Sequence, residues 1–89
     1  MLKITKIQES ASDVLLKLEG KITDQWAALL DGECRSFFRQ KKTVFLDCSN
    51  VEFIDERGVE VINNFPRKLV TLMSTPGFVT ELLQIGGQS

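Results

Sequence analysis

The fold is decided by one stretch of the chain, VFLDCSNVEFID at residues 44–55. Residues 43–47 are nearly continuously apolar, which is typical of a strand inside a sheet that is covered on both faces. The polar letters DCSN at residues 47–50 are expected to end that strand. Residues 51–54 then belong to a loop that leads to Asp55.

A short helix is predicted to begin at Asp55. An N-cap aspartate accepts hydrogen bonds from free backbone N–H groups, and Glu56 in the first turn suits the helix dipole. Pro66 ends the helix, because proline lacks an N–H group and restricts the residue before it. The residues expected to face the core are Val59, Ile62 and Phe65.

Two strands and a helix are predicted before this stretch. Residues 2–7 alternate apolar and polar, and residues 14–18 form an apolar run that ends at Gly20, so an antiparallel hairpin is expected. Thr23 is suited to cap the helix that follows. Apolar residues recur on one face of that helix at a 3.6-residue spacing: Trp26, Leu29, Leu30, Cys34, Phe37 and Phe38.

One more strand and one more helix are predicted after it. Residues 68–73 form the strand, and Pro76 suits the first position of the helix. Gly86 and Gly87 are expected to end the helix, and its buried side is expected to hold Phe78, Val79, Leu82, Leu83 and Ile85. The order β-β-α-β-α-β-α indicates an α/β fold with a four-stranded mixed sheet, parallel except for an antiparallel N-terminal edge.

Length and composition fit one domain over residues 1–89. Eleven basic and twelve acidic residues give a net charge of -1, so no nucleic-acid partner is expected. No apolar run suits membrane insertion and no signal peptide begins the chain, so a cytoplasmic location is expected. The chain has no histidine, and Cys34 and Cys48 fit no metal or redox motif, so we expect no enzyme, cofactor or metal site.

Several segments carry a resemblance to a known family. Residues 14–22 resemble a strand followed by G-x-[LI], and residues 44–55 resemble the pattern VVLDLSxVxFID. Residues 55–58, DERG, stand in the place of D-S-S-G, while residues 69–72 and 76–87 resemble the family's fourth strand and third helix. The chain thus resembles STAS domains, the fold of bacterial anti-sigma factor antagonists and of the cytoplasmic tails of sulfate-type anion transporters.

The departures from the family pattern affect the expected regulation. In the antagonists, the second serine of D-S-S-G is phosphorylated by a partner kinase; here that position is Arg57, which has no hydroxyl group. The resemblance therefore implies that the phosphorylation switch is absent. Many members also continue with a fifth strand and a fourth helix beyond the point where this sequence ends. Apolar surface left uncovered there would favour a partner or self-association.

The resemblance implies a non-catalytic regulatory domain that binds another protein. The expected partner is an anti-sigma kinase-like protein or a transporter subunit, with a homodimer as a further interpretation. The residues expected to bind it are Ser49, Asn50, Phe53, Asp55, Glu56, Arg57, Gly58 and Val59. For two of these a structural duty is an equal interpretation, because Asp55 suits an N-cap and Gly58 suits close helix packing.

Two other functions are considered. Some STAS domains accompany lipid transporters or bind nucleotides, so a small-ligand or transport accessory function is the alternative. An enzyme would use Asp47 and Asp55 as an acid–base pair or a magnesium site. Without histidine, an activated nucleophile or a phosphate-binding loop, that site lacks the rest of its machinery.

Overall fold

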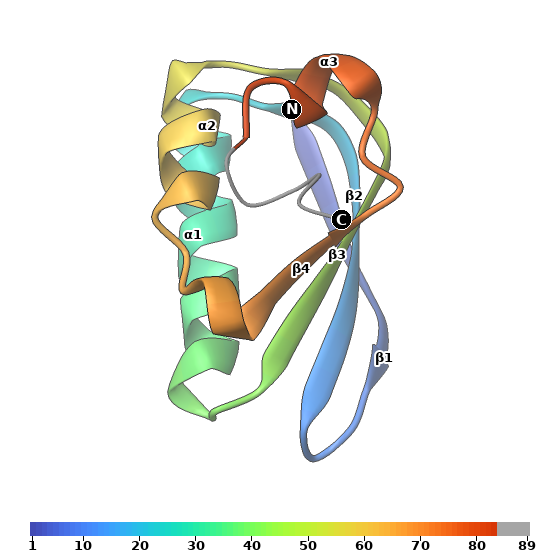
Figure 1. Ribbon diagram of the computed structural model, residues 1–89, viewed down its shortest axis with the longest axis vertical. Helices are drawn as coiled ribbons and strands as arrows, with labels where there is room; N and C mark the ends of the chain where they lie inside the picture. Colours follow the sequence, from blue (N-terminus) through green and yellow to red (C-terminus); the bar gives the residue numbers. More distant parts are fainter. Residues whose placement is uncertain (84–89) are drawn as a thin grey trace.

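The computed structural model describes residues 1–83 and shows a sheet with helices packed against it (Figure 1). A short 3₁₀ turn, Arg67–Leu69, precedes the last strand. The elements in chain order are β1 (Leu2–Glu9), β2 (Asp13–Ile22), α1 (Asp24–Arg39), β3 (Thr43–Ile54), α2 (Glu56–Asn63), β4 (Val70–Met73) and α3 (Gly77–Thr80).

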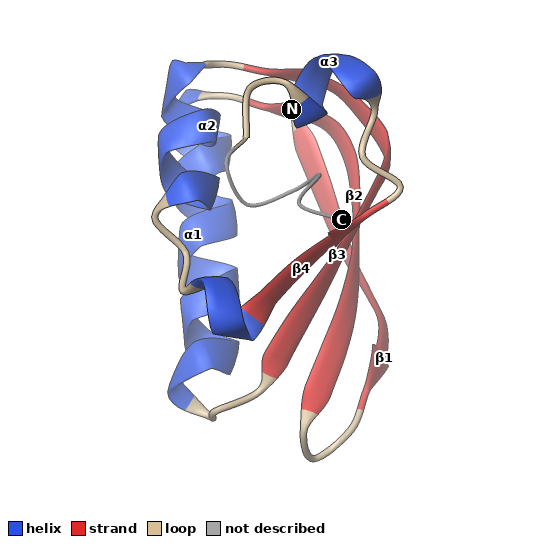
Figure 2. Cartoon of the chain, in the orientation of Figure 1, coloured by secondary structure: helices blue, strands red, loops and turns tan. Residues whose placement is uncertain are grey.

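The sheet has the strand order β1-β2-β3-β4. The pair β1 and β2 is antiparallel, while β2, β3 and β4 run parallel to one another. The predicted α/β fold with a mixed sheet and an antiparallel N-terminal edge is therefore confirmed. Helices α1 and α2 lie together on one side of the sheet (Figure 2).

The core lies between the sheet and these helices. In β3, Val44 and Leu46 are fully buried, whereas Phe45 between them is only half-buried. This alternation means that the strand has one well-covered face, so the prediction of cover on both faces is wrong. The apolar run led to the wrong prediction because the sequence alone does not distinguish a half-buried phenylalanine such as Phe45 from a core residue.

The predicted break at residues 47–50 is also wrong, because β3 continues as one strand to Ile54. Its buried residues after Leu46 are Cys48, Val51 and Ile54, and the last two steps between them are three residues long. A regular strand returns to the same face every second residue. The pairing with β2 shifts register at two places over this part of β3, and such bulges accommodate the extra residues.

The last part of the described chain also differs from the prediction. β4 is only four residues long, because residues 67–69 form the 3₁₀ turn in which the Leu69 N–H donates to the Pro66 carbonyl at 3.0 Å. α3 is one short turn, and the N-terminal neighbour Pro76 is its N-cap rather than its first residue. The predicted terminators Gly86 and Gly87 lie outside the described residues, as does Ile85.

Two apolar faces are narrower than predicted. After β4, Val79 and Leu83 are buried, but Phe78 and Leu82 are exposed. The residues within each pair are four positions apart, so Val79 and Leu83 lie on one side of the chain and Phe78 and Leu82 on the neighbouring side. Only one of these two sides faces the core. On α1 the same reasoning applies to Leu29, which is exposed although the pattern predicts it to be buried.

Candidate functional site

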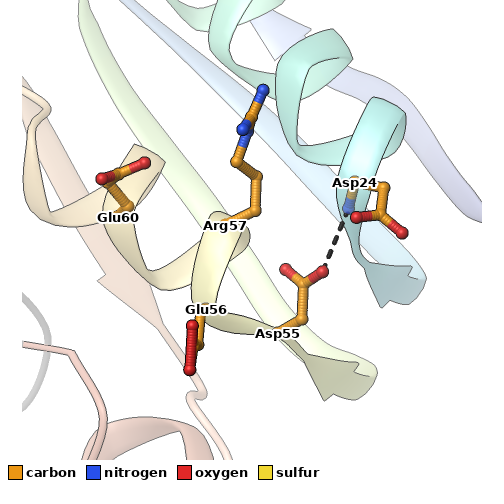
Figure 3. Close-up of a pocket in the computed structure, with 5 residues that line it drawn as sticks. All are labelled: Asp24, Asp55, Glu56, Arg57 and Glu60. Carbon is orange, nitrogen blue, oxygen red and sulfur yellow. Dashed lines mark hydrogen bonds between the residues drawn. The ribbon is translucent and has the colours of Figure 1, made fainter.

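The two main helices begin side by side at one end of the sheet, and Asp55 links their starts. Its Oδ1 accepts a hydrogen bond from the Gly58 N–H at 2.8 Å, which makes it the side-chain cap of α2. Its Oδ2 accepts another from the Asp24 N–H at 3.1 Å, as the dashed line in Figure 3 marks. This second bond matters because the Thr23 hydroxyl makes no cap bond to α1. Asp55 therefore fixes the relative position of two helix starts.

Gly58 sets how closely α2 approaches the sheet. It is buried, and a Cβ atom placed on it would lie 2.5 Å from the Ile22 carbonyl oxygen and 2.7 Å from Cγ1 of Ile54. No real Cβ atom approaches a backbone oxygen so closely, so only glycine fits. The structural duties expected of Asp55 as a cap and of Gly58 as a packing residue are confirmed. A role of either residue in partner binding stays a prediction.

The charged side chains around these helix starts surround a polar hollow of about 450 Å³. Its lining consists of Asp24, Asp55, Glu56, Arg57 and Glu60. In Figure 3 the Arg57 side chain reaches away from Glu56. Both side chains are exposed, and within residues 1–83 neither forms an ion pair. The hollow thus holds four carboxylates and one cation, none of which forms an ion pair in the described part of the chain. Asp55 accepts its hydrogen bonds from backbone N–H groups.

An apolar hollow of about 510 Å³ adjoins the polar one. Phe53 at the end of β3 is 50% exposed and lines it together with the half-buried Val59 of α2. The structure therefore brings Phe53, the charged start of α2 and Val59 onto one continuous surface. We call this surface, residues 53–60 with Asp24 and Leu82, the α2 surface.

Ser49 and Asn50 do not belong to the α2 surface. Both are exposed on β3, but neither lines either hollow. The Ser49 N–H donates to Oδ1 of Asp47 at 3.0 Å, and this hydrogen bond lowers the pKa of the Asp47 carboxyl below its usual value. These residues shape the irregular part of β3, and their role in partner binding stays a prediction.

The comparisons with known proteins identify the family. The model of the STAS domain matches residues 4–88, which is nearly the whole chain. The chain belongs to the STAS domain family. A solved structure described as the anti-sigma factor antagonist SpoIIAA in its unphosphorylated form has a similar fold, with a TM-score of 0.75. The sequences are 15% identical, and the match covers 94% of this chain and 84% of that one, so the likeness is one of fold. No curated protein matches this chain.

The enzyme interpretation requires the carboxylates of Asp47 and Asp55 to lie close together, and in this STAS domain they are at opposite ends of a strand segment. Asp47 and Asp55 are eight residues apart along a mostly extended segment, which spans at most roughly 26 Å at about 3.3 Å per residue. Each carboxylate also accepts local backbone hydrogen bonds. Over residues 1–83, no group of three or more histidine, cysteine or acidic side chains is arranged to hold a metal ion. The two aspartates therefore do not form one catalytic or magnesium site.

The two cysteines are buried in the core of this STAS domain, as the sequence predicts. Burial raises the pKa of both the Cys34 and the Cys48 thiol to about 12. A thiol with so high a pKa is a poor nucleophile near neutral pH. In the same part of the chain, 1–83, the structure shows no helix with the length and hydropathy needed to cross a membrane.

Apart from the buried Ile54, three residues of the α2 surface are not among the residues that the sequence predicts to bind a partner. Glu60 carries a visible signal, because it lies one helical turn after Glu56 and so extends the same face. Asp24 is recognisable as a first-turn residue, but its nearness to Asp55 depends on the parallel pairing of β2 with β3. Leu82 carries no signal, since its spacing equally suits a buried position.

Proposed function

We propose that this STAS domain is a non-catalytic interaction module of the cytoplasm that binds a protein partner through the α2 surface, independently of phosphorylation. The observation that carries the proposal is the position of Arg57. It is the second residue of α2, it is exposed, and it has no ion pair in the described part of the chain. The family resemblance gives this position to the phosphorylated serine.

Arg57 is poorly explained by stability alone. A helix N-terminus carries a partial positive charge, so a cation in the first turn is unfavourable there. The guanidinium group stays charged at any physiological pH and offers five N–H donors in a planar fork. Such a group suits a carboxylate or a set of carbonyl oxygens on a partner protein. Arg57 would therefore make a permanent contact at a position where the resembled antagonists carry a serine that is switched by phosphorylation.

The partner is proposed to be a kinase-like protein of the anti-sigma class, because the similar solved structure is described as an anti-sigma factor antagonist. A transporter subunit or a second copy of the chain would use the same surface. Nucleotides and anionic lipids fit it less well, since the polar hollow holds four carboxylates against a single arginine. Like charges would repel the phosphate groups of such ligands.

Affinity capture from cells of the source organism tests the proposal. Wild-type protein, an Arg57→Glu variant and an Arg67→Glu control are used as baits, and captured proteins are identified by mass spectrometry. Arg67 is an equally exposed arginine on the 3₁₀ turn before β4. We expect one partner to be captured by wild type and by Arg67→Glu, and lost with Arg57→Glu. Equal recovery of every protein by all three baits would remove the α2 surface from the proposal.

A further inference from the structure

The apolar hollow of the α2 surface has an unusual lining. Its apolar side chains come from the end of β3, from α2 and from the residue after α3: Phe53, Ile54, Val59 and Leu82. Its polar side chains are all acidic: Asp55, Glu56 and Glu60. The hollow therefore has an apolar floor and a rim with three carboxylates, and no basic residue among residues 1–83 lines it.

The apolar floor is open to solvent. Phe53 is 50% exposed and Leu82 is 49% exposed. A single exposed apolar residue is common on a protein surface, so the informative feature is that these two line the same hollow. These two side chains lie far apart in the sequence and yet line one hollow. Exposed apolar residues that gather in a concave site are typical of an anchor point for a large side chain of a partner.

The two glutamates of the acidic rim repel each other in the isolated chain, although the helix dipole favours Glu56 in the first turn. Glu56 and Glu60 lie four residues apart on α2, so they are neighbours on one face and repel each other. Both are exposed, and neither forms an ion pair in the described residues. Glu9, by contrast, forms ion pairs with Lys6 and Lys42. A basic ligand would relieve the repulsion at the rim.

We propose that the apolar hollow binds a basic segment of the protein partner, with one large apolar side chain against Phe53 and Leu82 and with lysine or arginine side chains at the rim. The proposal rests on the proposed function and specifies the chemistry of its partner. Arg57 contributes a separate contact, because its side chain reaches away from Glu56 (Figure 3). The chain's own residues 84–89, QIGGQS, have no charged side chain that would complement the rim.

Selection from a random peptide library tests this chemistry without knowledge of the partner. A library of 12-residue peptides on phage is selected on the full-length chain, and the strongest binder is synthesised and titrated. We expect the enriched peptides to carry a net positive charge and a large apolar residue. Glu60→Lys and Phe53→Ser should each weaken the binding of the peptide at least tenfold. Glu33→Lys, which reverses an exposed charge on α1, is the matched control and should leave the affinity within twofold.

The other outcomes overturn the inference. These are failure to enrich any peptide, enrichment of acidic or uncharged peptides, and equal affinity for wild type and Glu60→Lys. Enrichment that occurs only on an Ile85→Ser chain would assign the hollow to residues 84–89. Failure here is distinct from failure of the proposed function. A native partner that is lost with Arg57→Glu but kept with Glu60→Lys would preserve the docking surface and reject its basic ligand.

Discussion

The two ends of the molecule differ in whether their charged side chains form ion pairs among the described residues. At the end where β1 turns into β2, Glu9 forms ion pairs with Lys6 of its own strand and with Lys42 at the start of β3. These bonds lower the pKa of the Glu9 carboxyl to about 2. At the opposite end, where α1 and α2 begin, Glu56 and Arg57 have no such pair among the described residues. Figure 1 shows both ends in one view.

The difference separates charges that form ion pairs within the fold from charges that the proposed function assigns to recognition. Glu9 and Lys42 are 33 residues apart in the sequence, so their pair fastens the hairpin to the end of α1. At the other end the fastening is done by backbone hydrogen bonds to Asp55 and by the close packing of Gly58. Over residues 1–83 the neighbouring side chains of Glu56, Arg57 and Glu60 form no ion pair, and the proposed function assigns them to a partner. Substitutions at Gly58, Asp55 and Glu9 each remove one of these interactions.

The largest effect is expected for Gly58→Ala, which places a Cβ atom 2.5 Å from the Ile22 carbonyl oxygen. Overpacking of this kind costs about 1–3 kcal/mol of unfolding free energy. Gly32→Ala is the control, because no atom lies within 4 Å of the added group in mid-α1. It should stabilise the protein by about 0.5–1 kcal/mol through helix propensity. Urea denaturation measures both, and equal changes would show that the close approach of α2 is unimportant.

A smaller effect is expected for Asp55→Ala, which removes the cap of α2 and the bond to the Asp24 N–H. Loss of an N-cap costs about 0.5–2 kcal/mol. Asp55→Asn keeps one oxygen acceptor and should lose less. Thermal unfolding followed by circular dichroism compares the two variants. If both are as stable as wild type, the start of α2 does not depend on this side chain.

The smallest effect is expected at the charge pairs themselves. The pKa of Glu9 falls from 4.5 to about 2 on folding, so its stabilisation is fully present above pH 4.5 and is lost as the pH drops toward 2. Glu9→Gln should therefore lower the urea midpoint at pH 7 and lower it much less near pH 2. Glu60→Gln, which loses no ion pair, should keep or slightly raise the midpoint at pH 7. If both variants lower the urea midpoint equally at pH 7, the two ends of the molecule do not differ in how much their carboxylates stabilise the fold.

Much of the fold was predictable because local rules agree with tertiary structure. The strand over residues 2–7 and the cap at Asp55 each reflect backbone chemistry that the sequence displays. The match is less close in detail, because Ile7 is exposed and α2 ends at Asn63, three residues before Pro66. The extent of β3 was not predictable in the same way. Ser49 and Asn50 favour turns, but they stay in the strand because pairing with β2 continues to Ile54 through two shifts of register. Long-range pairing overrides local preference here.

The candidate site was predictable only where one segment supplies it. Phe53, Glu56 and Arg57 are neighbours in the sequence, so their common surface follows from a single helix start. Asp24 and Leu82 come from distant parts of the chain and join that surface through the sheet and the packing of α3. The unpaired state of Arg57 also depends on what lies around it in space. A sequence pattern does not show which charged side chains lack an ion pair in the described part of the folded chain.

The different lengths of β3 and β4 have a consequence for motion. β4 pairs only with residues 44–47, so from Cys48 to Ile54 the described sheet supports β3 by β2 alone. A strand segment with one neighbour opens at a lower free energy than one held on both sides, so hydrogen exchange should be fastest in this half. The α2 surface is built at the end of that segment. A partner that binds there would slow this opening, so the partner would act as a substitute for the missing length of β4.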